Sequence, residues 1–304
     1  MTEPHRPQPS RLSKLLRERA VWYFFLAPAV ILLALFLAFP LYRSLELAFF
    51  KWNGLTPRRW VGFDNFAALV HDKLFWSALV HTFVISIATT AGTVGLGLLL
   101  AVAISRRMPF SPLYRFAFYL PVMLPLTVVA ALWTRMFETT YGVVNTALRA
   151  IGLGALALPW LADPNIALWA VIAVVIWQYA GFPMIVLLAA IEGVPQSLHE
   201  AAALDGASAW HQIVHVTLPL IRPVIISISV IQIIFSLKIF DIVWVMTKGG
   251  PAESTSALGT YLYKQAFELH DYGFASAIAV AMFGIIFTIT YLYNRLMNVE
   301  HFEY

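Results

Sequence analysis

The chain has 304 residues, of which 60% are hydrophobic and 12% are charged, and its formal net charge is +4. Soluble domains are about 25% charged, so the composition excludes an ordinary soluble protein and indicates a polytopic membrane protein. The small net charge argues against a nucleic-acid partner, and the absence of cysteine excludes disulfides and thiolate metal sites. No GxxxxGKS or GxxxxGKT stretch is present, so the chain has no P-loop of its own.

The first predicted element is a membrane-anchoring helix over residues 21–41, an uncharged run that follows a basic tail over residues 1–20. A secretory signal core is about 7–15 residues long and precedes a small-residue cleavage site. This run is longer and no such site follows it, so we expect an uncleaved transmembrane helix. The basic residues of the tail are Arg6, Arg11, Lys14, Arg17 and Arg19.

Five further spans are predicted, each from a stretch with few or no charges and long enough to cross a hydrocarbon core about 30 Å thick. They cover residues 74–105, 116–134, 166–191, 223–247 and 272–294. The chain is therefore predicted to be an all-α membrane protein with six transmembrane helices in one domain, 21–304. Residues within these spans that favour close packing or bending are Gly92, Thr93, Gly95, Gly97, Pro121, Pro125, Gly181 and Pro183.

An even number of spans places both termini on the same side of the membrane. The Lys/Arg totals of the two sides are nearly equal, so the density of basic residues in short flanks decides the orientation. The tail and the short 105–115 turn, with Arg106, Arg107 and Arg115, are densely basic, whereas the basic residues of the other side are spread over 42–73 and two further loops. We therefore expect both termini to be cytoplasmic.

The loop between the fourth and fifth spans, 192–222, contains the stretch SLHEAAALDG. Ser197 and Glu200 have the spacing of a capping box, and Gly206 can close the helix in a left-handed conformation. Apolar residues then recur at helical spacing, so the loop is predicted to form two short helices joined at Gly206. A capped helix in such a loop can also be a simple connector, and the residues alone leave that alternative open. The later residues of this pattern are Trp210, Ile213, Val214, Leu218, Pro219 and Pro223.

The stretch EAAALDGASAWHQIVHVTLPLIRP resembles the EAA loop of binding-protein-dependent ABC importer permeases. The family pattern is E-A-A-x-x-D-G-A, a gap, then L-P and a further P. Val214 departs from it, since many members carry a phenylalanine there or at the next position. The matching residues are Glu200, Ala201, Ala202, Asp205, Gly206, Ala207, Leu218, Pro219 and Pro223.

A second stretch, LKIFDIVWVMTKGGPAEST, is similar to the carbohydrate-uptake branch of that family, the maltose-type and glycerol-3-phosphate-type permeases. The family text there is F-D, an apolar run, T-x-G-G-P and a later Thr. Lys248 stands where a glycine is common, which leaves a different backbone geometry open at that point. The matching residues are Phe240, Asp241, Thr247, Gly249, Gly250, Pro251 and Thr255, with the two glycines and the proline in an outer loop.

The resemblance implies a type I ABC importer permease fold and a non-catalytic subunit of a bacterial or archaeal inner membrane. The expected partners are a sister permease forming a heterodimer, two ATP-binding subunits, an extracytoplasmic solute-binding protein and membrane lipid. ATP and Mg²⁺ would bind the partner ATPase, so no cofactor is expected in this chain. The residues expected to couple to the ATPase are Glu200, Ala201, Ala202, Asp205, Gly206 and Ala207.

Lys238 and Asp241 are the only formal charges within a predicted span, and their spacing of three would place them on one helix face. Charges in spans usually face a cavity or a partner, so we expect an ion pair facing the interior near the outer mouth. The alternative is that Lys238 reaches the outer headgroups.

Further candidates for the translocation path are aromatic and amide residues of the fourth and fifth spans, because sugars are bound by aromatic faces flanked by a few polar groups. The first three candidates are consecutive, so at most two can face the path; packing between helices is the alternative for each aromatic. His211 and His215 are expected to be surface residues rather than metal ligands. The path candidates are Trp177, Gln178, Tyr179, Gln232, Phe235 and Ser236.

The expected cargo is a neutral sugar, specifically a di- or oligosaccharide. Glycerol-3-phosphate or a glycerophosphodiester is the main alternative, because those relatives share the GGP region. An anionic phosphate favours several convergent cations, and the spans supply only Lys238. An ion-coupled secondary transporter is a weaker alternative, since Asp241 is the only carboxylate within a span.

Overall fold

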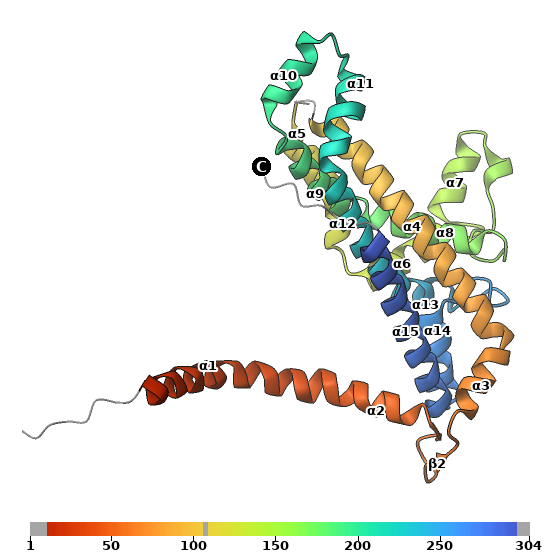
Figure 1. The fold of residues 1–304 in the computed structure, drawn as a ribbon. Coiled ribbons are helices and arrows are strands. Elements are labelled where there is room, and N and C mark those ends of the chain that lie inside the picture. Colours follow the sequence, from red (N-terminus) through yellow and green to blue (C-terminus); the bar gives the residue numbers. More distant parts are fainter. Residues whose placement is uncertain (1–10, 106–108, 297–304) are drawn as a thin grey trace, which may run out of the picture.

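The computed structural model describes residues 11–105 and 109–296 (Figure 1). Helices dominate, and the only sheet in that part of the chain is a two-stranded hairpin of β1 (Phe50–Lys51) and β2 (Arg59–Trp60). The α-helices are α1 (Arg11–Leu33), α2 (Phe39–Leu47), α3 (Asp64–His71), α4 (Lys73–Ser105), α5 (Ser111–Tyr119), α6 (Leu126–Met136), α7 (Val143–Ala150), α8 (Ala167–Tyr179), α9 (Gly181–Glu192), α10 (Gln196–Leu204), α11 (Ala209–Gln212), α12 (Leu218–Leu237), α13 (Asp241–Thr247), α14 (Leu258–Tyr263) and α15 (Tyr272–Leu296).

Short π and 3₁₀ segments connect or extend several of these helices. The π segments are Ala34–Ala38, Ile213–Thr217 and Lys264–Glu268, and the 3₁₀ segments are Leu120–Met123 and Gly154–Leu156. The first π segment joins α1 and α2 into one long rod, and the second joins α11 to α12. The third extends α14.

Four helices are long and apolar enough to cross a membrane: Trp22–Leu47, Lys73–Ser105, Ala209–Leu237 and Tyr272–Tyr293. Two further spans are present if each bent helix pair counts as one: α5 with α6, bent by 95°, and α8 with α9, bent by 42°. The prediction of an all-helical membrane protein with up to six spans is therefore confirmed.

The 166–191 span bends by 42° between α8 and α9, and two other predicted spans differ more from the structure. The 116–134 span is not a straight helix, because the chain turns by 95° between Met123 and Leu126. The 223–247 span is also wrong: α12 ends at Leu237, and α13 starts separately at Asp241. Hydropathy shows where a chain avoids water but does not show where its helix breaks, so both stretches were predicted as continuous helices.

The long helix α4 lies at the centre of the bundle and packs against α8, α9 and α12. Glycine makes this packing close, as the sequence predicted. A Cβ added at Gly97 would lie 2.9 Å from the backbone nitrogen of Met184, and one added at Gly92 would lie 2.3 Å from Ile176 Cδ1. A Cβ at Gly95, in contrast, would meet nothing within 4 Å.

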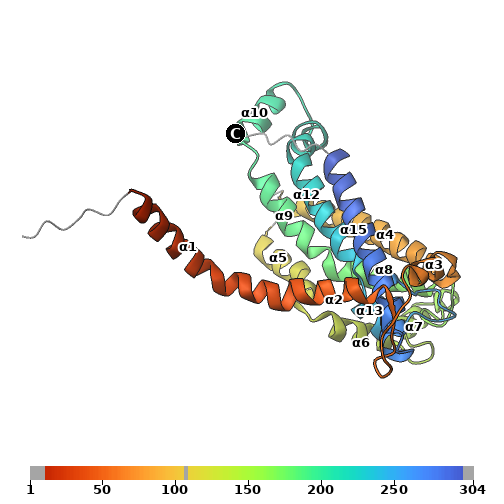
Figure 2. The ribbon, with the colours of Figure 1, turned by 60° about the horizontal axis from the view of Figure 1, so that its bottom comes forward.

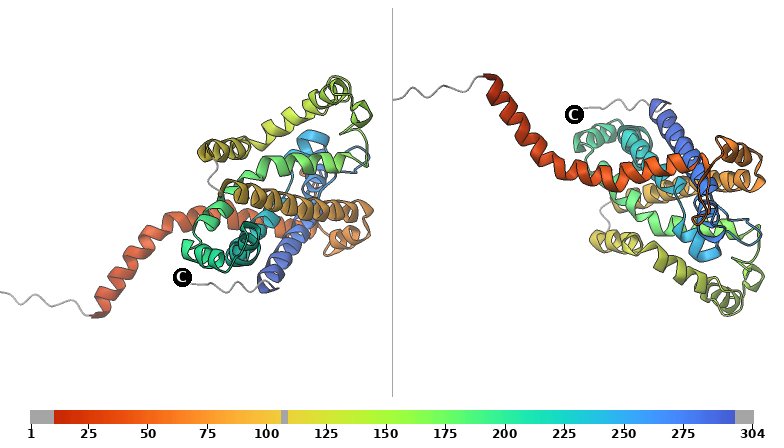
Figure 3. Two further views of the ribbon diagram at one scale, coloured as in Figure 1. Left: turned by 90° about the horizontal axis from the view of Figure 1, so that it is seen from above. Right: turned by 90° about the horizontal axis from the view of Figure 1, so that it is seen from below.

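The rod formed by α1 and α2 leaves the bundle near the hairpin; α2 packs against α15, and the α1 end extends away from the bundle (Figures 1, 2 and 3). The most apolar window of its Trp22–Leu47 stretch has no buried residue. Directly after α2, the chain is held by Asn65, whose side-chain amide donates to the carbonyls of Ala48 and Phe50. The first predicted span is thus a helix whose apolar surface lies outside the fold of this chain.

Candidate functional site: a cavity and a coupling loop

The helix α10 lies at one end of the molecule, together with α5, and the hairpin and α3 lie at the opposite end (Figure 1). None of the α10 residues is buried. Leu204 at its end is 90% exposed, and Trp210 shortly beyond is 66% exposed. An isolated short helix that offers apolar side chains to its surroundings is typical of a surface that a partner covers.

The end of α10 is closed as the sequence predicted. Gly206 has a φ of +81°, its N–H donates to the Ala203 carbonyl, and the Ala207 N–H donates to the Ala202 carbonyl. This pair of bonds is a Schellman motif, which satisfies carbonyls that the helix end would leave free.

The predicted capping box at the start of α10 is wrong. Pro195 is the N-cap residue, no side chain caps the helix, and Ser197 lies one position inside it. The proline is itself the N-cap residue, two positions before the one that the box requires, and its extended conformation, with a ψ of 128°, leads into the first turn. A serine cap occurs instead at α11, where Ser208 Oγ accepts from the His211 N–H.

The second helix of the loop is not short. It begins at Ala209 and continues through a π segment into α12, giving one helical run to Leu237. Pro223 lies inside this run without breaking it. The second half of the 192–222 loop is therefore continuous with the fifth span. His211 and His215 lie exposed on this run with their rings stacked at 5.1 Å.

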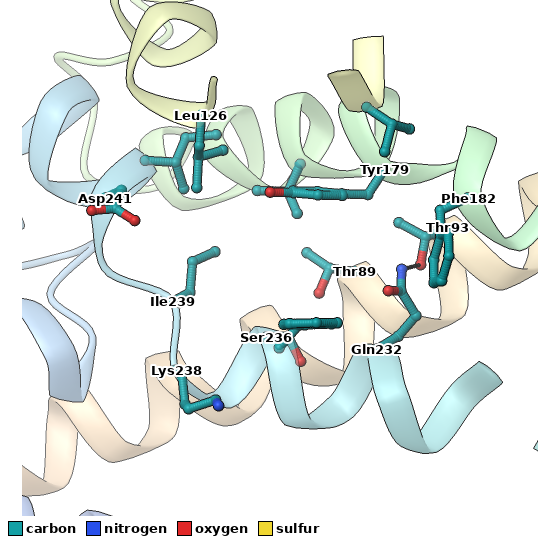
Figure 4. A pocket seen from close by; sticks show the side chains of 14 residues that line it. Thr89, Thr93, Leu126, Tyr179, Phe182, Gln232, Ser236, Lys238, Ile239 and Asp241 are labelled. Carbon is teal, nitrogen blue, oxygen red and sulfur yellow. Dashed lines mark hydrogen bonds between the residues drawn. The ribbon is translucent and has the colours of Figure 1, made fainter. Parts of the chain in front are cut away.

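A cavity of about 440 Å³ lies between α4, α12 and the two bent helix pairs (Figure 4). Both breaks contribute to it: Val122 and Leu126 flank the sharper one, and Tyr179 and Phe182 flank the shallower one. The full lining is Thr89, Thr93, Val122, Leu126, Val175, Tyr179, Phe182, Gln232, Phe235, Ser236, Lys238, Ile239, Asp241 and Ile242.

Six predicted path residues line this cavity: Tyr179, Gln232, Phe235, Ser236, Lys238 and Asp241. Two do not. Trp177 packs its ring against Trp133 at 5.3 Å, and Gln178 is fully buried with its Nε2 donating to the Leu124 carbonyl. Of the three consecutive candidates on α8, only Tyr179 lines the cavity.

Polar side chains on the cavity wall are hydrogen-bonded between α12 and α4. Gln232 Nε2 donates to Thr93 Oγ1 over 2.8 Å, and the Ser236 and Ser86 hydroxyls lie 2.7 Å apart. Sequence reasoning did not single out Thr89 or find a path role for Thr93. Their spacing of four, which places both on one face of α4, was the signal that could have revealed them.

The predicted ion pair of Lys238 and Asp241 is wrong. Lys238 caps the end of α12, and Asp241 begins α13, so the two residues do not share a helix face. Figure 4 shows their side chains on either side of Ile239. The ion pairs found within 11–105 and 109–296 are elsewhere: Arg43–Glu46, Arg115–Glu192 and Lys264–Glu253. Both charged side chains nevertheless line the cavity.

The GGP loop is held by its own threonines. The hydroxyls of Thr247 and Thr255 lie 2.7 Å apart, and Thr255 Oγ1 also donates to the Gly250 carbonyl. Lys248 has a φ of +53° and Gly249 one of +86°. The lysine thus takes the left-handed conformation that a glycine adopts freely.

A helical membrane domain with broken spans, a cavity at the breaks and an exposed helix on one connecting loop defines the transmembrane subunit of a transporter. The comparisons with known proteins give the family. The model of the "Binding-protein-dependent transport system inner membrane component" family matches residues 93–299, and the chain belongs to that family.

Relatives of known name cover nearly the whole chain. It is 34% identical to the sulfoquinovosyl glycerol transport system permease protein of Agrobacterium fabrum, over 94% of this chain and 92% of the relative. It is 31% identical to the lactose transport system permease protein of Rhizobium radiobacter, over 89% and 91% of the two chains.

A solved structure shows the same fold: a subunit of a bacterial ABC transporter involved in the import of the acidic polysaccharide alginate. The TM-score is 0.83 at 28% identity, covering 95% of this chain and 99% of that one. The chain is therefore a non-catalytic, multi-pass inner-membrane permease subunit of a binding-protein-dependent ABC importer. Its similarity to permeases of carbohydrate transporters confirms both sequence resemblances.

Proposed function

We propose that this permease passes a sugar, a di- or oligosaccharide, that an extracytoplasmic binding protein delivers. The observation that carries the proposal is the cavity lining. Aromatic rings of Tyr179, Phe182 and Phe235 share it with the amide of Gln232 and the hydroxyl of Ser236. Aromatic faces pack on the apolar face of a sugar ring, and amides and hydroxyls can exchange their mutual bonds for bonds to sugar hydroxyls.

The charge of the cargo is the finer part of the proposal. Lys238 is the only cation among the lining residues, and Asp241 lines the same cavity. A phosphorylated polyol favours several convergent cations, so the lining supports a neutral sugar over glycerol-3-phosphate. The names of the relatives support a saccharide without deciding its charge, since lactose is neutral and alginate is acidic.

The test is ATPase stimulation of the reconstituted complex with its binding protein. Disaccharides should stimulate hydrolysis, and glycerol-3-phosphate or a glycerophosphodiester should not; stimulation by the phosphates alone contradicts the proposal. Within this chain, Tyr179→Leu should reduce sugar transport more than Trp177→Leu. The two positions are two residues apart on α8, but only Tyr179 lines the cavity.

We further propose that α10 docks on an ATPase subunit through the residues from Glu200 to Ala207, and that this end of the molecule and both termini are cytoplasmic. A sister permease, two ATPase subunits that bind ATP and Mg²⁺, and the binding protein complete the assembly. The exposed surface of α10 and the continuous helix from Ala209 to Leu237 that follows it support the docking role. A reporter fused at residue 304 that proves external would contradict the orientation.

Docking can be tested with a matched pair of glycines. Gly206 and Gly152 both have a φ of +81° with nothing within 4 Å of an added Cβ. Gly206→Trp and Gly152→Trp therefore carry a similar backbone strain of about 1–2 kcal/mol. Only Gly206→Trp should lose co-purification of the ATPase; normal docking and transport by that variant would rule out the role of α10.

A further inference from the structure

One ion pair joins the coupling loop to the broken third span. Arg115 of α5 donates to Glu192, the last residue of α9, although the two lie 77 positions apart in the chain. The same guanidinium donates from Nε to Ser111 Oγ over 3.2 Å, which holds the arginine on its own helix as well. The other ion pairs within 11–105 and 109–296, Arg43–Glu46 and Lys264–Glu253, join residues close in sequence.

Glu192 lies just before α10, the helix proposed to dock on the ATPase and called the coupling helix below. Only 193–195 separate it from α10, which begins at Gln196. This link is ordered by backbone hydrogen bonds, from the Gly193 N–H to the Ala189 carbonyl and from the Val194 N–H to the Ile191 carbonyl. A displacement of α10 therefore reaches Glu192 through a short, hydrogen-bonded connection.

Arg115 lies on the element that leads to the cavity. The chain runs from α5 through the 3₁₀ turn Leu120–Met123 to the 95° break, where Val122 and Leu126 line the cavity. Val122 follows Arg115 by seven positions, a distance of about 10 Å along a helical path at 1.5 Å per residue. The α5 segment also touches the start of α9, since a Cβ at Gly181 would lie 2.2 Å from the Phe118 carbonyl oxygen.

We propose that the Arg115–Glu192 pair is a mechanical tie, which makes the third span follow the coupling helix and thereby moves the cavity wall during transport. Both are positioning residues and do not touch the cargo. The inference rests on the proposed docking of α10. The side chains are 37% and 47% exposed, and ion pairs this exposed contribute little to folding stability. Losing the tie should therefore uncouple transport from ATP hydrolysis rather than unfold the protein.

The experiment is a charge exchange in the reconstituted complex with its binding protein. Arg115→Glu and Glu192→Arg are made singly and together, and the sugar transported per ATP hydrolysed is measured beside the melting temperature. Each single variant should lower the transport ratio about fivefold, the effect of roughly 1 kcal/mol of lost coupling. The double variant should recover to within about twofold of the parent, and all melting temperatures should stay close to it.

The matched control is the exchange of Arg43 and Glu46, an exposed pair of the same type within α2, which should leave the ratio unchanged. A double variant no better than the single ones overturns the tie, because each charge then acts on its own, as Arg115 would if it bound anionic lipid. A normal ratio in both single variants overturns it as well. If Gly206→Trp keeps its ATPase, the docking proposal itself has failed; if it loses the ATPase, a failed exchange counts against the tie alone.

Discussion

The third and fourth spans are both broken near a proline, yet one bends by 95° and the other by 42°. In the third span the helix ends before Leu124, which is extended with a ψ of 140°, and Pro125 then caps the start of α6. In the fourth span Ala180 keeps helical angles between α8 and α9, and Pro183 lies within the first turn of α9.

The two breaks differ in where the proline falls within its helix. A proline disfavours helical angles at the residue before it, so Pro125 favours the extended conformation of Leu124. Pro183 occupies a first turn, where its missing N–H is not needed, and the Met184 N–H still reaches the Ala180 carbonyl over 3.2 Å.

The two bends depend on each other. Backbone at membrane depth is stable only where its polar groups find partners inside the protein. The carbonyl of Leu124, left free at the sharper break, accepts from Gln178 Nε2 just before the shallower one. The cavity therefore lies where two broken spans satisfy one another, and changes at this contact should affect it most.

The largest effect is expected from filling the space between the bends. In Gly181→Val the new Cβ would lie 2.2 Å from the Phe118 carbonyl oxygen and 2.9 Å from Tyr119 Cα. These are backbone atoms and cannot rotate away, so overpacking should cost about 1–3 kcal/mol or more. We expect a lower melting temperature of the purified complex and loss of transport.

The control for this substitution is Gly95→Val in α4, where an added Cβ meets nothing within 4 Å. It should change the melting temperature little, since valine and glycine both have modest helix propensity. If the two variants are equally stable, the contact between α5 and α9 is looser than the structure indicates.

A smaller loss is expected when the bends lose their hydrogen bond. Gln178→Leu would leave the Leu124 carbonyl, which accepts a part-buried hydrogen bond, without its side-chain donor; such a loss costs about 1–3 kcal/mol where the group lies away from water. Gln178 Oε1 is itself buried without a partner, so its removal returns part of that cost and places the net effect at the low end. The melting temperature should fall less than in Gly181→Val, and a gain in stability would show that the bond does not hold the break.

The sequence predicted the straight parts of this architecture well. The uncharged run at 74–105 became α4 with its start one residue earlier, and 272–294 became most of α15. The run at 116–134 failed because Leu124 turns out of the helix within an equally apolar stretch. The run at 223–247 failed because α12 ends before Lys238 and a new helix begins at Asp241, so the two residues do not share the predicted helix face.

The candidate site was predictable in its chemistry more than in its geometry. The EAA pattern located α10 and its closing glycine, but Pro195 displaced the capping box by setting the helix start. In the cavity, Gln232 and Ser236 were found because polar groups in spans need partners. Two predicted residues of α8, Trp177 and Gln178, do not line the cavity, whereas Tyr179 beside them does. Which side of α8 faces the cavity depends on how the helix packs against its neighbours.

The smallest effects are expected from the prolines themselves, and they test whether the sequence or the surroundings hold each bend. Pro125→Ala allows helical angles at Leu124, but the Gln178 bond and the Gly181 contact still favour the bent form. Replacing a compatible proline costs about 0.4–1 kcal/mol through the unfolded state, and Pro183→Ala should cost no more than that.

The chain has no cysteine, so one introduced pair can carry spin labels across the sharper break, at the exposed positions Leu113 and Leu132. We expect Pro125→Ala to broaden that distance distribution without moving its main peak and Pro183→Ala to leave it unchanged. A main peak that shifts to the longer distance of a straight helix in Pro125→Ala would show that the proline alone makes the bend.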